Sequence, residues 1–263
     1  MSDPLVLITT DARGVATVAL NRPEIRNAFN EVLIEELRST FERVATDPKI
    51  RLMVLTGNGK SFSAGGDLNW MRRQGQASEQ ENLEDGYRLA LMLKTLDILP
   101  KPVIGKVHGS AFAGGIGLVA CCDVAIAAEG TKFSLSEVKL GLAPATIGPY
   151  VTAAIGPRQM RRYVITGEVF EAPEAKRIGL VHDVVAAEKL DEAVEKVVAE
   201  LLSGGPEAHA ATKELIRDVT GRAIDEPLMR DTASRIAGRR ASAEGAEGIQ
   251  AFLDKRKASW VRA

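Results

Sequence analysis

The sequence predicts an α/β fold in which an alternating body of strands and helices is followed by a helical tail. Up to about residue 202, short apolar runs typical of strands alternate with segments of helical periodicity. Beyond that point every segment has the helical period, and the breaker sequence 203–206 separates the two parts. We therefore expect a core over residues 1–203 and a C-terminal helical region over residues 204–263.

Composition narrows the class of protein. Its 263 residues suffice for one large domain, or for a domain with a small appendage. A net charge of −1 offers no basic field to nucleic acid, and no apolar run approaches the ~20 residues of a membrane span. The first residues lack the basic and apolar regions of a signal peptide. Cys121 and Cys122 are adjacent in an apolar run, which favours reduced core residues, and the histidines lie far apart. We therefore expect a cytoplasmic protein without a metal site.

Five short apolar runs predict strands. The first two are separated by the turn composition of residues 11–14, so they predict a hairpin. The third run is closed by Gly57 and the fourth by the turn His108-Gly109. The expected strands are residues 5–10, 15–20, 52–56, 103–107 and 124–128.

Helical periodicity predicts the remaining regular structure. Asn30 is a suitable N-cap for the first helix, and Pro100 and Pro102 end the second. The polar segment 69–78 is expected to be a mobile loop. The expected helices are residues 30–45, 83–99, 116–120, 158–166, 172–178, 190–202, 207–219, 226–237 and 242–256.

A loop of small residues follows the fourth strand and contains Gly114, where a short apolar helix begins. Free N–H groups at such a helix start can stabilise a developing negative charge. The pattern Gly115-x-Gly117-x-x-Ala120, with Glu137 twenty residues after its second glycine, also matches a dinucleotide fingerprint. That fingerprint normally lies directly at the end of a first strand, which this loop does not. Close packing of the helix against a strand is the other alternative.

A second small-residue loop, residues 62–68, follows the third strand. A ligand could lie against its backbone, because glycine lets other groups approach closely. The N–H groups of Gly66 and Gly114 could then converge on one carbonyl oxygen. Such donors are worth on the order of 3 kcal/mol each to an enolate-like transition state. A plain surface turn is the alternative for this segment taken alone.

A lone carboxylate, Glu137, lies between apolar residues shortly before Gly141 and Pro144. A carboxylate held in an apolar site has a raised pKa and suits proton transfer near neutrality. The alternative is a carboxylate that only favours a helix start, beside the capping-type residue Ser136.

The order and spacing of these motifs resemble the crotonase superfamily, also called the enoyl-CoA hydratase/isomerase family, over nearly the whole chain. The similar segments are residues 20–23, 27–30, 62–68, 101–115, 122–123, 137–141 and 252–256. The resemblance implies a crotonase-like spiral of ββα units with a C-terminal helical trimerisation region, assembled as a homotrimer or a dimer of trimers. It also implies acyl-CoA thioester substrates and no separate cofactor, since coenzyme A is part of the substrate.

The resemblance further implies roles for individual residues. The N–H groups of Gly66 and Gly114 would form an oxyanion hole, and Glu137 would match the second of two glutamates used by the family's hydratases. The first glutamate falls at Gly117, which keeps a Δ3,Δ2-enoyl-CoA isomerase with a single glutamate as an alternative. The residues that would bind coenzyme A are Arg26, Ala28, Ala64, Asp67 and Leu68, with Phe252 and Lys255 reaching the nucleotide of a neighbouring subunit.

Two segments narrow the expected substrate. Residues 120–123 and 136–147 resemble bacterial methylglutaconyl-CoA and isohexenylglutaconyl-CoA hydratases, which act in leucine and acyclic terpene breakdown. We therefore expect a hydratase-type lyase that adds water across the 2,3 double bond of 3-methylglutaconyl-CoA or a related branched 2-enoyl-CoA. Arg72 or Arg73 would bind the distal carboxylate of such a substrate, unless they form a solvated surface pair. A CoA-ester-binding protein without turnover is the alternative from another class.

Overall fold

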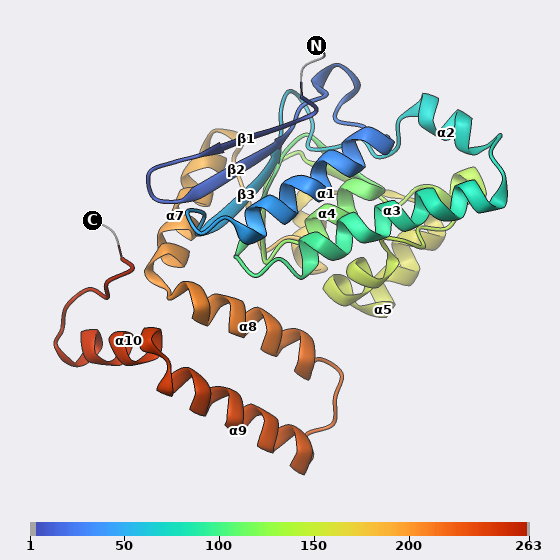
Figure 1. Cartoon of the computed structure of the whole chain (residues 1–263). Helices are drawn as coiled ribbons and strands as arrows, with labels where there is room; N and C mark the ends of the chain where they lie inside the picture. Colours follow the sequence, from blue (N-terminus) through green and yellow to red (C-terminus); the bar gives the residue numbers. More distant parts are fainter. Residues whose placement is uncertain (1–3, 262–263) are drawn as a thin grey trace.

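The chain folds into a six-stranded sheet, a smaller three-stranded sheet and covering helices, and its last three helices stand apart (Figure 1). The computed structural model describes residues 4–261. The strands are β1 Val6–Thr10, β2 Val15–Leu20, β3 Leu52–Gly57, β4 Val103–Val107, β5 Ser110–Phe112, β6 Val124–Ala128, β7 Lys132–Ser134, β8 Val169–Glu171 and β9 Asp183–Val185. The α-helices are α1 Glu31–Thr46, α2 Leu68–Gln74, α3 Glu79–Asp97, α4 Gly114–Ala120, α5 Gly148–Thr166, α6 Ala172–Arg177, α7 Leu190–Ser203, α8 Pro206–Val219, α9 Glu226–Ala241 and α10 Ala243–Leu253. Short 3₁₀ helices lie at Pro23–Ile25, Glu137–Leu140 and Ala187–Lys189.

The larger sheet has the strand order β1-β2-β3-β4-β6-β9, and β1 is its antiparallel strand. The predicted hairpin of β1 and β2 is confirmed, with Val6 opposite Leu20. From β2 onward the neighbours are parallel, so the chain must cross over between them. The predicted α/β class is therefore correct.

Both faces of the larger sheet are covered, which explains why its inner strands are almost wholly apolar. Met53 and Leu55 of β3 join the main core, to which α1, α3, α4 and α5 contribute. Leu52 and Val54 alternate to the opposite face and pack on α7.

Two strands of the larger sheet lead directly into the smaller one. β4 turns at His108-Gly109 into β5, and β6 turns at Glu129-Gly130 into β7. β5 and β7 pair in parallel, and β8 joins them antiparallel. A helical segment follows each step, α4 after β5 and the 3₁₀ helix Glu137–Leu140 after β7. The chain thus advances as the predicted spiral of ββα units.

The segment 69–78 was predicted to be a mobile loop, and that prediction is wrong. Most of it belongs to α2, which Asp67 caps by accepting hydrogen bonds from the first N–H groups of the helix. Ser78 and Glu81 then form a capping box at the start of α3. The caps thus stabilise helix starts that apolar periodicity does not reveal.

Four short strands and the first half of α5 were also missed. β5, β7, β8 and β9 have three residues each, too few for a periodic signal. α5 begins at Gly148 rather than at residue 158. It bends at Gly156, which has a non-helical φ of 73° and is followed by Pro157. Pairing with distant segments fixes these elements, not the local sequence.

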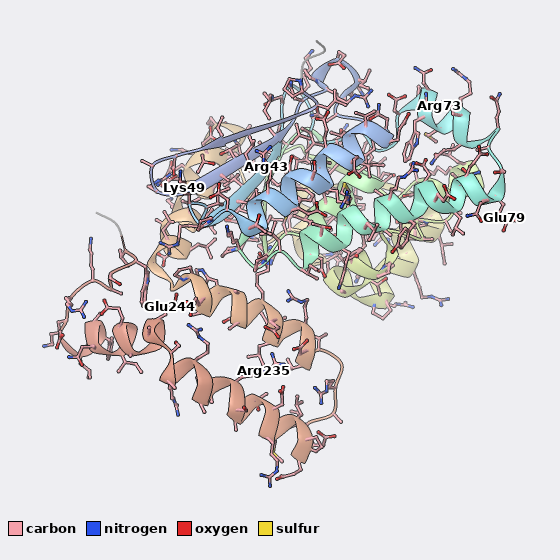
Figure 2. All side chains as sticks on the ribbon, in the orientation of Figure 1. Arg43, Lys49, Arg73, Glu79, Arg235 and Glu244 are labelled. Atoms are coloured by element: carbon pink, nitrogen blue, oxygen red, sulfur yellow. The ribbon has the colours of Figure 1, made fainter. Side chains whose placement is uncertain are left out.

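The tail comprises α8, α9 and α10 and begins directly after the breaker segment 203–206 (Figure 1). Several core–tail hydrogen bonds tether it; among them, Arg51 donates to the Trp260 carbonyl at 2.9 Å, and Lys213 of α8 bonds Asp123 at 2.6 Å. Inside the tail, Glu244 of α10 accepts hydrogen bonds from the first N–H groups of α8 (Figure 2). Whether the tail is a separate domain stays a prediction.

The turn between β4 and β5 provides a test of this packing. Gly109 has φ 66°, and a Cβ there would overlap the Lys60 carbonyl oxygen. We expect Gly109→Ala to lower the free energy of unfolding by about 3 kcal/mol or more. Gly130→Ala is the matched control, because Gly130 has φ 74° but open space around its Cα. That variant should lose only about 1 kcal/mol. Urea unfolding measures both, and equal losses would contradict the steric argument.

Candidate active site

Three parallel segments lie side by side at the smaller sheet, with β5 at the centre. Ser63 pairs with Ala111 of β5 on one side, and Ser134 of β7 pairs with Phe112 on the other. Hydrogen bonds of 3.0 Å join Phe112 N to Ser63 O and Ala113 N to Ser134 O. Because the segments are parallel, their carboxyl ends meet at one edge.

Gly66, Gly114 and Glu137, the three residues expected to carry the chemistry, lie just beyond this common edge. Gly66, Gly114 and Glu137 each lie three positions after a paired residue of one of the three segments. The two glycine loops touch, since a Cβ on Gly65 would lie 3.2 Å from the Cβ of Ala113. The structure therefore brings together loops that are almost 50 residues apart in the sequence (about 48 positions from Gly66 to Gly114).

The N–H groups of Gly66 and Gly114 make no hydrogen bond within the described residues 4–261. The Phe29 backbone forms hydrogen bonds with both neighbours of Gly66. Its N–H donates to Gly65 O at 2.6 Å, and its carbonyl accepts from Asp67 N at 2.8 Å. Gly114 opens α4, where a helix has no acceptor for the first N–H. The Phe29 ring also covers this glycine, since a Cβ there would lie 2.7 Å from ring atom Cε2. One phenylalanine thus fixes both loops.

Ala113, the residue before α4, has a backbone conformation that L-residues avoid, with φ 46° and ψ −116°. These angles are close to those of the first central residue in a type II′ turn, a position dominated by glycine. The Ala113 carbonyl accepts from Ile116 and Gly117, at 2.9 and 3.3 Å, so the helix begins at once behind it. Strain of this kind concentrates at functional sites.

Glu137 opens the 3₁₀ helix that follows β7. Its Oε2 atom is buried and has no hydrogen-bond partner in the part of the chain that the structure describes. Burial raises the pKa of the carboxyl, and only a hydrogen bond from its own backbone N–H acts in the opposite direction. Ser136 makes no side-chain cap, so a purely helix-starting role does not account for the buried oxygen. A carboxyl group in this state is suited to carry a proton.

Gly117, where the first family glutamate would fall, is closely surrounded. A Cβ there would lie 2.6 Å from Ile147 Cγ2 and 3.3 Å from Leu93 Cδ2. Both neighbours belong to the main core. A side chain at position 117 would therefore have to displace Ile147, and no second acid can occupy this place without repacking. This close packing, inside a helix, also accounts for the glycine that matched the dinucleotide fingerprint.

Five of the residues expected to bind coenzyme A gather around the loop of Gly66. Ala64 N donates to Arg26 O at 2.8 Å, which joins the two segments that carry them. Arg26 and Leu68 are exposed, Ala28 is buried and Asp67 is half-buried. These five residues thus share one region next to the free N–H of Gly66.

The Asp67 carboxylate is already engaged by the chain itself. It accepts from Arg22 at 3.0 Å and from the N–H groups of Asn69 and Trp70 at 2.8 and 3.2 Å. Burial would raise the pKa of this carboxyl, but the hydrogen bonds outweigh it and lower the pKa from 3.8. The Asp67 carboxylate therefore serves the chain itself, as the cap of α2 and the partner of Arg22.

Phe252 and Lys255 lie far from the other candidates. They belong to the end of the tail, and Figure 1 places α10 across the molecule from α2. The Phe252 side chain is 82% exposed. Within one chain the structure does not bring these two residues to the site.

The arginines on α2 form a surface pair. Arg73 donates to Glu31 of α1 at 2.7 Å, and Figure 2 places it on the outer side of α2. Arg72 bonds Asn69 at 3.1 Å, and both arginines are exposed. Both arginines are thus solvated, and of the two only Arg73 is paired with an acid in the part of the chain that the structure describes.

His108 has the structural role of a turn residue, because its Nε2 atom lies 3.1 Å from the Gly59 carbonyl oxygen. Burial lowers its pKa despite that hydrogen bond. Among residues 4–261 there is no group of three His, Cys, Asp or Glu side chains arranged to hold a metal ion. Over the same residues, none of the helices is both long and apolar enough to cross a membrane.

Sequence reasoning missed the residues that hold these loops in place. Asn27 has a fully buried side chain whose Nδ2 donates to the carbonyls of Asn58 and Ser61, at 2.9 and 2.8 Å. Arg22 bonds the Ala28 carbonyl at 2.6 Å. Both lie in or near motif segments, but nothing in one sequence tells a loop-fixing side chain from a ligand-binding one.

Comparison with known proteins identifies the family. The model of the enoyl-CoA hydratase/isomerase family matches residues 10–262. The chain belongs to this family. Crotonyl-CoA hydratase of Syntrophomonas wolfei is 34% identical over 97% of each chain, and trans-2-decenoyl-(acyl-carrier-protein) isomerase of Streptococcus mutans is 31% identical over 93% of each. An enoyl-CoA hydratase structure from Shewanella pealeana superposes with a TM-score of 0.95 at 42% identity, covering 97% of this chain and 96% of that one.

The family assignment confirms the predicted crotonase fold and identifies an enzyme of the enoyl-CoA hydratase family. The expected acyl-CoA thioester substrates are consistent with this family. The alternative of a non-catalytic CoA-ester-binding protein is not retained, because the relatives are named as hydratases.

The raised pKa of Glu137 predicts how the stability of the protein depends on pH, whether or not this residue is catalytic. Because folding raises its pKa above 4.5, the folded chain binds more protons than the unfolded chain between the two values, and stability falls as pH rises through that window. Glu137→Gln removes this loss. We expect the variant to be more stable than the unchanged protein at neutral pH, with the difference vanishing in acid, as measured by urea unfolding across pH.

Glu81→Gln is a control of opposite sign. Hydrogen bonds from Ser78 lower the pKa of Glu81, so this variant should lose stability at neutral pH and regain parity in acid. If Glu137→Gln follows the same course as this control, the Glu137 carboxyl is not held in an unfavourable site.

Proposed function

We propose that the protein hydrates a 2-enoyl-CoA thioester to the 3-hydroxyacyl-CoA. One observation supports this above the others. Two backbone N–H groups and one buried carboxylate oxygen, all without a partner among residues 4–261, lie beyond the same edge of three parallel segments. In this proposal Gly66 and Gly114 form the oxyanion hole and Glu137 moves the proton.

The proposed reaction begins when the thioester oxygen accepts hydrogen bonds from Gly66 and Gly114. Water adds its oxygen to Cβ while the ionised Glu137 takes a proton from it, and the electrons of the double bond pass to the thioester oxygen. The two N–H groups stabilise that enolate, each by about 3 kcal/mol. Glu137 then returns the proton to Cα, so atoms and charge balance. Amide donors polarise the carbonyl in this scheme, and we propose that no metal or redox cofactor takes part.

For the substrate we propose a branched 2-enoyl-CoA, with 3-methylglutaconyl-CoA as the first candidate. Residues 120–123 and 136–147 support it by their resemblance to glutaconyl-CoA hydratases. Arg73 is paired with Glu31 at the surface, whereas Arg72 bonds only the neutral side chain of Asn69. Of the two, Arg72 would therefore be the one to meet a distal carboxylate. A panel of 2-enoyl-CoA esters with and without that carboxylate, followed by loss of enone absorbance, tests the choice.

The proposed role of Glu137 has a direct test. Glu137→Gln should lower turnover by about 10²- to 10⁴-fold, because the amide cannot accept and return a proton. Binding of a saturated acyl-CoA, measured by calorimetry, should remain within about threefold, since the oxyanion hole is intact. Turnover at the unchanged rate would remove Glu137 from the mechanism.

A Δ3,Δ2-enoyl-CoA isomerase is the second candidate function. The space at Gly117 is filled by Ile147, so a single acid serves the site, and one relative is named as an isomerase. A 3-enoyl-CoA incubated in deuterated water distinguishes the two. Double-bond migration with deuterium uptake and no hydroxyacyl product would favour the isomerase.

We propose that the tail assembles the protein into a trimer or a dimer of trimers and completes the coenzyme A site of a neighbour through Phe252 and Lys255. Two features support this. A groove of about 800 Å³ runs between α8, α9 and α10, and large apolar side chains of α9 and α10 are exposed. These are Ile236, Ile249, Phe252 and Leu253.

Light scattering tests the assembly. The expected molar mass is three or six times the 28.2 kDa of the chain. Ile249→Asp should reduce it, because the charge would have to be desolvated at the interface. Gln250→Ala, at an exposed position of the same helix, is the control and should leave the molar mass unchanged. A monomeric unchanged protein would overturn the proposal.

We also propose a cytoplasmic location, in line with the reduced cysteines.

A further inference from the structure

Helix α2 lies at the periphery of the molecule, near the start of α1 and beside α3 (Figure 1). It has seven residues, and Trp70 is the one among them whose side chain is buried. A helix this short is not stable by itself. Contacts from outside α2 must therefore hold it in place.

Asp85 of α3 supplies such contacts. Its Oδ2 atom accepts a hydrogen bond from Trp70 Nε1 at 2.7 Å and another from Gln74 Nε2 at 2.8 Å. The Asp85 side chain is only 14% exposed, and Arg88 lies 3.7 Å from its other oxygen. One carboxylate oxygen can hold two donors, and hydrogen bonds to a charged acceptor are the stronger kind.

Further side-chain links join α2 to the body: Asn82 of α3 donates to the Gln74 carbonyl at the end of α2, at 3.0 Å, and an ion pair lies at the surface. Arg73 pairs with Glu31, but these side chains are 58% and 41% exposed. Exposed ion pairs contribute little, because water screens them and two long side chains must be ordered. Asp85 therefore contributes two hydrogen bonds from a largely buried carboxylate, and these hold α2 more strongly than the exposed ion pair does.

Helix α2 in turn closes one side of Gly66. A Cβ on Gly66 would lie 3.2 Å from Cγ and Sδ of Met71 and 3.8 Å from Cε3 of Trp70. Phe29 fixes the other side of the loop through its backbone. A continuous path of contacts thus runs from Asp85 through Trp70 to Gly66.

We propose that Asp85 is a positioning residue: by holding Trp70 and Gln74 it keeps α2 closed on Gly66, as a fixed wall beside the bound acyl group. The inference rests on the proposed function, in which Gly66 receives the thioester oxygen. It assigns Asp85 no contact with substrate. Its effect on the reaction passes entirely through α2.

A matched pair of variants tests the role in turnover. Asp85→Leu has a similar size but no acceptor, whereas Asp85→Asn keeps an oxygen that can accept both hydrogen bonds. We expect the Leu variant to lower kcat about 10- to 100-fold, because a small displacement of the site is costly. The Asn variant should stay within about threefold of the unchanged enzyme. Trp70→Phe, which keeps the ring and loses only the N–H, should follow the Leu variant and provides the test if that variant does not fold.

Tryptophan fluorescence tests the physical step without turnover. The chain has two tryptophans, so a Trp260→Phe background reports Trp70 alone. Acrylamide quenching of Trp70, which is 8% exposed, should rise severalfold in Asp85→Leu and stay unchanged in Asp85→Asn. Unchanged quenching in the Leu variant would overturn the proposal, as would increased quenching with an unaltered kcat. If the unchanged protein turns over no enoyl-CoA, the proposed function fails, and the quenching still decides whether Asp85 holds α2.

Discussion

Parallel pairing on both sides of β5 is the constraint on which the candidate site depends. Ser63 and Ser134 flank this strand, and backbone hydrogen bonds set their positions along it to within a fraction of a residue. Three loops therefore leave one edge at the same level. Their order along the chain does not matter for this result, because hydrogen-bond register determines which residues meet.

The groups at this edge are unfavourable for folding when taken alone. Two N–H groups and one carboxylate oxygen have no partner in the described chain, and Ala113 has a backbone conformation suited to glycine. Unsatisfied buried groups and strained backbone each cost free energy. The apolar cores on both faces of the larger sheet offset that cost. Groups that lack a partner in the protein are the ones that a bound substrate can satisfy.

Gly117 links this site to the packing of the helices. Its missing side chain lets α4 lie against Ile147 and Leu93, so the space that a second acid would need is filled with hydrocarbon. The absence of a second acid at position 117 is therefore set by the packing of the core as well as by the residue at that position.

The sequence by itself determined the α/β class, the central strands and the helical tail, because those segments are long enough to show a period. Its ordered glycine motifs and Glu137 also pointed to the right family and to loops that do meet. Their assigned roles remain proposals. It did not reveal β5, β7, β8 and β9, which have three residues each and exist only by pairing with distant segments.

Only the tertiary structure decided how the candidate residues are held. Asp67 reads as a ligand-binding residue in the sequence, but its carboxylate caps α2 and pairs with Arg22. The segment 69–78 reads as a loop, but caps and the buried contact of Trp70 with Asp85 make it largely helical. The physical reason is common to both cases. A side chain's partners are set by segments far away in the chain, and local composition carries no information about their distance.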